Sequence, residues 1–137
     1  MLTIRVSSFS YVYGTIPSDP SGNGGGFVFD CRALPNPGRY DEYKSLTGMD
    51  KSVIDYLEKE EEVKEFLDQS FALIDQAVKR YIERGFESLM VSFGCTGGRH
   101  RSVFAAERLS QYISDNYDET LISLRHWARE AENKSTK

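Results

Sequence analysis

The 137-residue sequence predicts one α/β domain, with a sheet of about four strands that is largely parallel or mixed and has helices on both faces in a Rossmann-like arrangement. Two observations lead to this prediction. Short apolar runs alternate along the chain with longer segments in which apolar residues recur every three or four positions. The longest of these segments separates two apolar runs, as expected for the crossover between parallel strands. We assign residues 1–130 to this domain and expect residues 131–137 to form a polar, disordered tail.

Four short segments are predicted to be strands, namely residues 2–6, 27–31, 89–93 and 120–124. The first alternates apolar and polar residues, which indicates a strand with one buried face. The second and third are mainly apolar, which is typical of strands buried in a sheet. Residues 7–26 are rich in Ser, Gly, Pro and Tyr, so we expect a long loop between the first two strands.

Three segments are predicted to be helices, namely residues 50–60, 63–82 and 101–114. Asp50 is a suitable N-cap for the first, and Gly85 is well placed as the C-cap after the second. The Pro35-Asn36-Pro37 segment excludes a helix at that point, because proline fixes φ and restricts the residue before it. A stiff, extended loop is expected there instead.

Composition limits the classes of function. The net charge of −4 argues against a general nucleic-acid binder but leaves room for a local basic patch. No apolar run approaches the roughly 20 residues that span a membrane, so we expect no membrane association. Cys31 and Cys95 do not form a disulfide framework, and no secretory signal is visible. We therefore expect a cytoplasmic protein with reduced thiols, although a bridge between the two cysteines stays open.

The segment from Gly94 to Ser102 joins an apolar strand to an amphipathic helix and has the composition of an anion-binding loop. Its glycines allow the backbone to approach a ligand closely and to turn amide groups toward it. Arginine and histidine side chains add positive charge, and hydroxyl groups add donors. We therefore expect a phosphorylated small molecule to bind at Cys95, Thr96, Gly97, Gly98, Arg99, His100, Arg101 and Ser102.

Other interpretations of this loop concern catalysis. It lacks the spacing of a Walker A loop, which argues against ATP hydrolysis of that type. Cys95, Arg101 and Ser102 have the C-x5-R-S spacing of cysteine phosphatases, in which a thiolate attacks phosphorus and the arginine stabilises the equatorial oxygens. Asp30 or Asp41 could then supply the general acid. We favour a thiol that lines the pocket without reacting, so no catalytic residue is assigned.

Asp30 and Arg32 lie at the end of the second predicted strand. Because ligands bind at the carboxyl ends of parallel strands, the Asp30–Gly38 loop and the Gly94–Ser102 loop are expected to line one crevice. Asp30 could accept hydrogen bonds from sugar hydroxyls or from an ammonium group. It could equally cap a turn or pair with Arg32. His100 and His126 do not have metal-ligand spacing with the cysteines, so neither a metal nor a cofactor is expected.

Three motifs occur in order along the chain, at residues 8–17 (Ser-Phe-Ser-Tyr-Val-Tyr-Gly-Thr-Ile-Pro), 28–37 (Val-Phe-Asp-Cys-Arg-Ala-Leu-Pro-Asn-Pro) and 94–103. With residues 46–51 and 125–126, they resemble the C-terminal domain of the RNase adapter protein RapZ family over residues 8–130. The resemblance implies a domain that senses glucosamine-6-phosphate, binds small regulatory RNA and contacts an endoribonuclease. It also implies a sugar-phosphate pocket formed by Asp30, Arg32, Cys95, Thr96, Gly97, Gly98, His100 and Arg101.

Several residues depart from the family pattern where RNA is concerned. Val12-Tyr13 stand where the family has Lys-His, Gly38 where it often has His, and Lys59 where it has Arg, and the basic tail is reduced to residues 133–137. Each lost cation removes a phosphate contact and the counterion release that accompanies it. The P-loop nucleotide-binding domain of full-length members is not in this sequence, so its role is not carried over.

The sequence thus predicts a regulatory binding or sensor domain for a phosphorylated metabolite, with an amino-sugar phosphate such as glucosamine-6-phosphate as the leading ligand. The alternatives are a cysteine-dependent phosphatase that uses Cys95 and Arg101, and an RNA-binding adapter domain for an RNase. RNA, a partner protein and a second copy of the chain stay open as partners.

Overall fold

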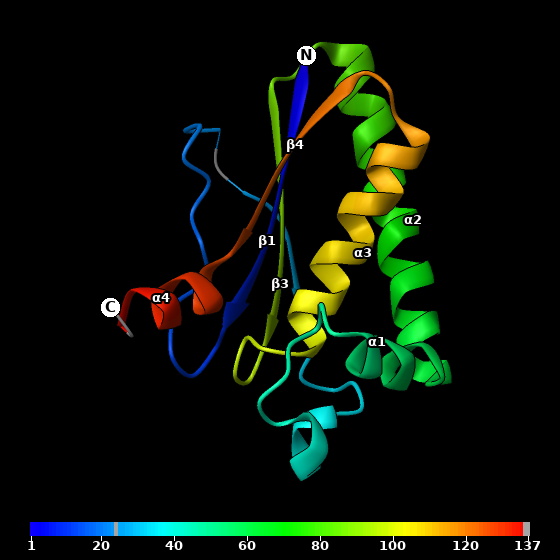
Figure 1. Ribbon diagram of the computed structural model, residues 1–137. Coiled ribbons are helices and arrows are strands. Elements are labelled where there is room, and N and C mark those ends of the chain that lie inside the picture. The colour runs from blue at the N-terminus through cyan, green and yellow to red at the C-terminus, as the bar shows by residue number, and fades with distance from the viewer. Residues whose placement is uncertain (24, 136–137) are drawn as a thin grey trace.

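The computed structural model describes residues 1–23 and 25–135 and contains a four-stranded sheet flanked by helices (Figure 1). The strands are β1 (Leu2–Ser10), β2 (Gly26–Asp30), β3 (Ser88–Cys95) and β4 (Thr120–His126). The helices are α1 (Lys51–Glu58), α2 (Glu61–Arg84), α3 (Arg101–Asn116) and α4 (Trp127–Ser135). Two short 3₁₀ turns, η1 (Pro37–Arg39) and η2 (Asp41–Tyr43), precede α1.

All paired strands are parallel, and their order across the sheet is β2-β3-β1-β4. The predicted α/β fold with a parallel sheet is therefore confirmed. The Rossmann-like arrangement is not confirmed, because β1 lies beside β2 in a Rossmann sheet and beside β3 here.

The connections between strands explain which face each helix covers. The chain passes from β2 through α1 and α2 to β3, and from β3 through α3 to β4, so both crossovers step in the same direction across the sheet. Right-handed crossovers that step the same way lie on the same face. Figure 1 shows α2 and α3 together on one side of the sheet. The connection from β1 to β2 steps the other way and lies with α4 on the opposite side (Figure 1).

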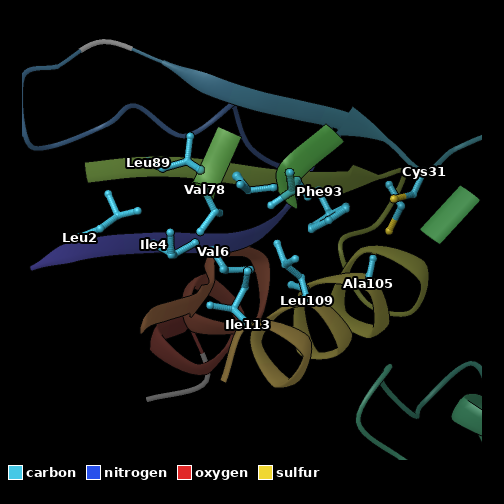
Figure 2. Close-up of a cluster of buried hydrophobic side chains, with 14 residues drawn as sticks. Leu2, Ile4, Val6, Cys31, Val78, Leu89, Phe93, Ala105, Leu109 and Ile113 are labelled. Carbon is cyan, nitrogen blue, oxygen red and sulfur yellow. The ribbon is translucent and has the colours of Figure 1, made fainter. Parts of the chain in front are cut away.

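The main core lies between the sheet and the two long helices (Figure 2). Side chains of β1, α2, β3 and α3 fill it, among them Leu2, Ile4, Val6, Val78, Leu89, Phe93, Leu109 and Ile113. The residues between them in β1 point to the other face of the sheet, where the buried hydroxyls of Ser7 and Ser92 are hydrogen-bonded at 2.9 Å. This is the alternation that the sequence predicts for residues 2–6. The strand itself continues to Ser10 with every residue buried from Val6 onward, because the buried serines find polar partners.

A second cluster of buried side chains fixes α1 against α2 and α3. It consists of Val53, Leu57, Val63 and Phe104. Leu34, in the loop after β2, packs against both this cluster and the main core. The loop that carries the predicted Asp30–Arg32 end of the site is therefore held by apolar contacts on its inner side.

The helix boundaries confirm most of the predicted ends. Gly85 follows α2 with a φ of 70°, which is the left-handed conformation of a glycine C-cap. Asp50 precedes α1 as predicted, but its carboxylate accepts a hydrogen bond from Thr47 N at 2.7 Å and none from the helix. The predicted absence of helical structure around Pro35 and Pro37 is wrong, because η1 begins at Pro37. The fixed φ of proline suits the first position of a helical turn.

Residues 127–135 form α4, where the sequence predicts a polar tail from residue 131. The helix is supported by Ala128, which packs on the loop after β3, and by ion pairs between Arg125 and Glu130 and between Arg129 and Glu132. Residues 136–137 of the expected tail lie outside the described residues. No helix in the described part of the chain is both long and apolar enough to cross a membrane.

Candidate anion-binding site

The loop between β3 and α3 is fastened to the end of β1 and to α4. Ser10 Oγ donates a hydrogen bond to Thr96 O at 2.7 Å. Gly98 has a φ of 66°, and a Cβ at this position would lie only 2.6 Å from Ala128 Cβ. Glycine therefore permits both the left-handed backbone of the loop and the close approach of α4.

A cavity of about 530 Å³ lies beside this loop. Six of the ten predicted ligand residues line it, namely Cys95, Thr96, Gly97, Arg99, His100 and Arg101. The rest of the lining comes from the segment after β1, the Asn36–Gly38 turn and α4, through Tyr13, Asn36, Gly38, Ala128, Ala131 and Glu132. The predicted meeting of the loop after β2 with the loop after β3 thus occurs through Asn36 and Gly38.

Arg101 is a buried cation in this lining, with 5% of its surface exposed. Its Nη1 donates hydrogen bonds to Arg32 O at 2.8 Å and to Leu34 O at 3.0 Å. Its Nε is buried and has no hydrogen-bond partner among the described residues. The side chain therefore ties the loop after β2 to the start of α3, and one of its donors is left without a partner among the described residues.

Arg99 is the second arginine of the cavity, and a carboxylate of α4 already binds it. Its Nη2 donates to Glu132 Oε1 and Oε2 at 2.9 Å and 3.1 Å, and its Nη1 donates to Ser45 O at 3.2 Å. Arg129 also donates to Glu132. Hydrogen bonding by Arg129, together with the charge of Arg99, lowers the pKa of Glu132, so that this carboxylate stays ionised at neutral pH.

His100 contributes a neutral imidazole to the site rather than the positive charge expected from the sequence. Its side chain lies against the Gly38 turn, and Nε2 donates a hydrogen bond to Tyr43 O at 2.8 Å. Burial lowers the pKa of His100, and the neighbouring arginines lower it further. With Nε2 carrying the proton, Nδ1 holds a lone pair that can accept a hydrogen bond from a ligand.

Cys95 is buried, although it reaches the cavity lining. Its Sγ lies 3.1 Å from Ser102 Oγ, which is also buried, so Ser102 supports Cys95 from the core side of the loop. Cys31 is buried nearby at the end of β2, and burial raises the pKa of its thiol. Both cysteines are free thiols.

Asp30 and Arg32 form an ion pair at the carboxyl end of β2, outside the cavity lining. Arg32 Nε donates to Asp30 Oδ1 at 2.9 Å and Nη2 donates to Oδ2 at 2.7 Å, with both side chains about half exposed. The Arg32 guanidinium also stacks 3.8 Å from the ring centre of Tyr11. Hydrogen bonding to Arg32 lowers the pKa of Asp30. This pair is linked to the cavity through Arg101, which holds the Arg32 carbonyl.

Comparison with known proteins follows the same segments. Residues 2–129 match the RapZ C-terminal domain family. The chain belongs to this family. A "Nucleotide-binding protein" of Glaesserella parasuis is 37% identical over 135 residues, which cover 98% of this chain and 44% of that protein. A "Nucleotide-binding protein" of Caldicellulosiruptor saccharolyticus is 42% identical over 115 residues, which cover 84% of this chain and 37% of that protein. The chain spans less than half the length of these relatives.

The cavity of this RapZ C-terminal domain is also lined by residues outside the ten predicted from the sequence. Asn36 and Gly38 belong to the stiff segment around Pro35 and Pro37 that the sequence predicts, so this motif could have indicated them as lining residues. The residues of α4 could be found only by recognising Ala128 and Ala131 as an apolar pair spaced for one helix face. Among residues 1–23 and 25–135, no group of three or more His, Cys, Asp or Glu side chains is arranged to hold a metal ion.

Proposed function

We propose that this RapZ C-terminal domain is a regulatory binding domain for a phosphorylated metabolite, with an amino-sugar phosphate such as glucosamine-6-phosphate as its ligand. One observation carries the proposal. Arg101 is almost fully buried, lines the cavity beside a glycine loop and keeps an Nε donor without a protein partner among the described residues. A phosphate oxygen is the acceptor that suits a buried guanidinium at the start of a helix. The relatives' name, nucleotide-binding protein, is consistent with a phosphorylated ligand, although it describes proteins more than twice as long.

In the proposed binding mode the two ends of the ligand meet different groups. Arg101, Arg99 and the amides of the glycine loop hold the phosphate. The neutral Nδ1 of His100 accepts a hydrogen bond from a sugar hydroxyl. Asp30 and Arg32 read the amino-sugar end from the rim of the site, where their mutual ion pair gives way to contacts with the ligand.

Calorimetric titration tests the proposal with glucosamine-6-phosphate, glucosamine and inorganic phosphate as separate ligands. We expect saturable binding of the sugar phosphate and a loss of at least about tenfold in affinity for Arg101→Ala and Arg101→Lys, because a buried charge-assisted hydrogen bond is removed or misplaced. Arg108→Ala is the matched control. This arginine lies on the same helix but does not line the cavity, and its Nη2 donates a hydrogen bond to Glu58 Oε1 at 2.7 Å. Unchanged affinity in both Arg101 variants would exclude this binding mode.

A cysteine-dependent phosphatase is the second candidate, because Cys95 reaches the cavity lining next to Arg101. The same titrations therefore include an assay for released phosphate. We expect none, since Cys95 is buried and in contact with Ser102. Phosphate release that Cys95→Ser abolishes would instead make the domain an enzyme.

A further inference from the structure

The carboxylate of Glu132, a residue of α4, already binds an arginine of the anion-binding loop. It lines the cavity and accepts two hydrogen bonds from Arg99, at 2.9 Å and 3.1 Å. Arg99 belongs to the same glycine loop that the proposed function assigns to the phosphate. An internal anion and the ligand therefore require the same cation.

The position of α4 makes this contact a link between the cavity and the end of the chain. Ala128 packs against Gly98, and Ala131 lines the cavity, so this face of α4 forms one of its walls. The start of the helix is also held outside the cavity, where the Arg125 guanidinium stacks 3.7 Å from the Trp127 ring centre. Glu132 lies further along the helix and connects its second turn to the anion loop.

Electrostatics favours exchange of one anion for the other. A phosphate monoester brings close to two negative charges to a cavity in which Glu132 keeps its own. Two anions at one guanidinium repel each other in a partly buried site. Arg129 lies on the same helix and already donates to Glu132, so a displaced carboxylate keeps a cationic partner. Displacement therefore leaves no buried charge unpaired.

We propose that Glu132 is an internal competitor for the anion site, and that phosphate binding displaces it from Arg99 and releases the second turn of α4 from the loop. This inference rests on the proposed function, since it needs a phosphate group at the loop. Because of this release, the position of α4 depends on whether the anion site is occupied by ligand. A partner that contacts α4 would then distinguish the ligand-bound domain from the free one.

Titrations with inorganic phosphate and with glucosamine-6-phosphate test the competition. We expect Glu132→Gln to bind both ligands about threefold to tenfold more tightly than the unsubstituted protein, because the competing charge is gone while the size of the side chain is kept. Glu130→Gln is the matched control, since Glu130 lies on the same helix and pairs with Arg125. Circular dichroism establishes that both variants keep their helical content.

Equal or weaker binding by Glu132→Gln would overturn the proposal, and selective weakening for glucosamine-6-phosphate would make Glu132 a contact for the ligand's ammonium group instead. Binding by the unsubstituted protein separates this failure from failure of the proposed function. If neither the unsubstituted protein nor any variant bound either ligand, the proposed function and the competition by Glu132 would both be excluded.

Hydrogen exchange of the amides of residues 128–132 gives a second measurement. We expect faster exchange in the unsubstituted protein when ligand is added, and fast exchange in Glu132→Gln even without ligand. Slower exchange on ligand addition would show that α4 closes on the ligand, and it would contradict release.

Discussion

Gly97 and Gly98 are neighbours in the anion loop, but the structure constrains them differently. Gly98 has a φ of 66°, and a Cβ there would lie 2.6 Å from Ala128 Cβ and 3.0 Å from Ser10 N. A Cβ on Gly97 would meet nothing within 4 Å. A pattern of glycines in the sequence cannot separate these two cases, since only the fold brings α4 and β1 against one of them.

Substitution of these glycines tests the crowding at the loop. We expect Gly98→Ala to lower the free energy of unfolding by about 1 to 3 kcal/mol, through a left-handed backbone that alanine adopts poorly and through contact with α4. Gly97→Ala should change it by less than about 0.5 kcal/mol. Urea unfolding of the two variants measures the difference, and equal destabilisation would contradict the close approach of α4 to Gly98.

His126 is a second residue whose surroundings only the structure defines. Its Nδ1 lies 2.6 Å from Ser8 Oγ, and its Nε2 lies 3.8 Å from Glu107 Oε1. Burial lowers the pKa of His126, and this outweighs the opposing effect of the Glu107 and Glu130 carboxylates. The folded domain therefore resists protonation at this imidazole.

This lowered pKa predicts a loss of stability on acidification. Below the ordinary pKa of 6.5 the unfolded chain takes up a proton at this position while the folded domain does not, so the free energy of unfolding falls as the pH falls toward the folded pKa. His100, with a pKa lowered in the same direction, adds to the effect. We expect His126→Gln to show a smaller loss between about pH 7.5 and pH 5.5 in urea unfolding. An equal loss in both proteins would assign the whole effect to other groups.

At the scale of elements, the segment before α1 determines how the start of α3 is held. Gly48 N donates a hydrogen bond to Arg99 O at 2.9 Å. A Cβ on Gly48 would lie 2.4 Å from His100 O and 2.5 Å from Phe104 N. The segment before α1 thus lies directly on the backbone that carries Arg99 and His100.

We therefore expect Gly48→Ala to push this segment away from α3, to lower the free energy of unfolding by about 1 to 3 kcal/mol and to weaken phosphate binding. Gly14→Ala is the control, because a Cβ there would make only an ordinary contact with Ser10 O at 3.4 Å. Urea unfolding and phosphate titration of both variants provide the measurement. Normal phosphate affinity in Gly48→Ala would separate the segment from the site.

The elements that the sequence predicts well are those whose pattern is local. The apolar face of α2 and the Gly85 C-cap lie within one segment, and the structure confirms both. The extension of β1 beyond residue 6 and the helix α4 depend on distant partners. Buried serines at the end of β1 are satisfied by β3 and its loop, and α4 packs on Gly98. Composition alone makes both segments look like loop or tail.

The same division applies to the candidate site. The glycine and arginine content of residues 94–102 identifies the anion loop, because that chemistry is contiguous in sequence. The ion pair between Asp30 and Arg32, two residues apart, is one of the alternatives that the sequence offers, whereas the contact of Glu132 with Arg99 is not predictable in this way. Which cation a carboxylate binds is decided by tertiary distance, and Arg99 and Glu132 are 33 residues apart.

At the scale of the whole molecule, the site lies where the connections between strands reverse the direction in which they step across the sheet. The connection after β3 crosses one face through α3, and the connection after β1 crosses the other face toward β2. β1 and β3 are neighbours and stay paired to their carboxyl ends, so the crevice lies where the two connections leave them toward opposite faces. Tyr13 and the anion loop line the cavity from these two connections. Strand order, which the sequence does not reveal, thus determines the position of the site.

The central place of β1 also has a consequence for the order of events during synthesis. Ser7 and its partner Ser92 are 85 residues apart, and β4, on the other side of β1, comes later still. At roughly 5 to 20 residues per second, a ribosome needs on the order of 4 to 17 seconds to make the chain between these two serines. For that time β1 is exposed without either neighbouring strand, so the nascent domain offers an unpaired apolar strand to chaperones until β3 emerges.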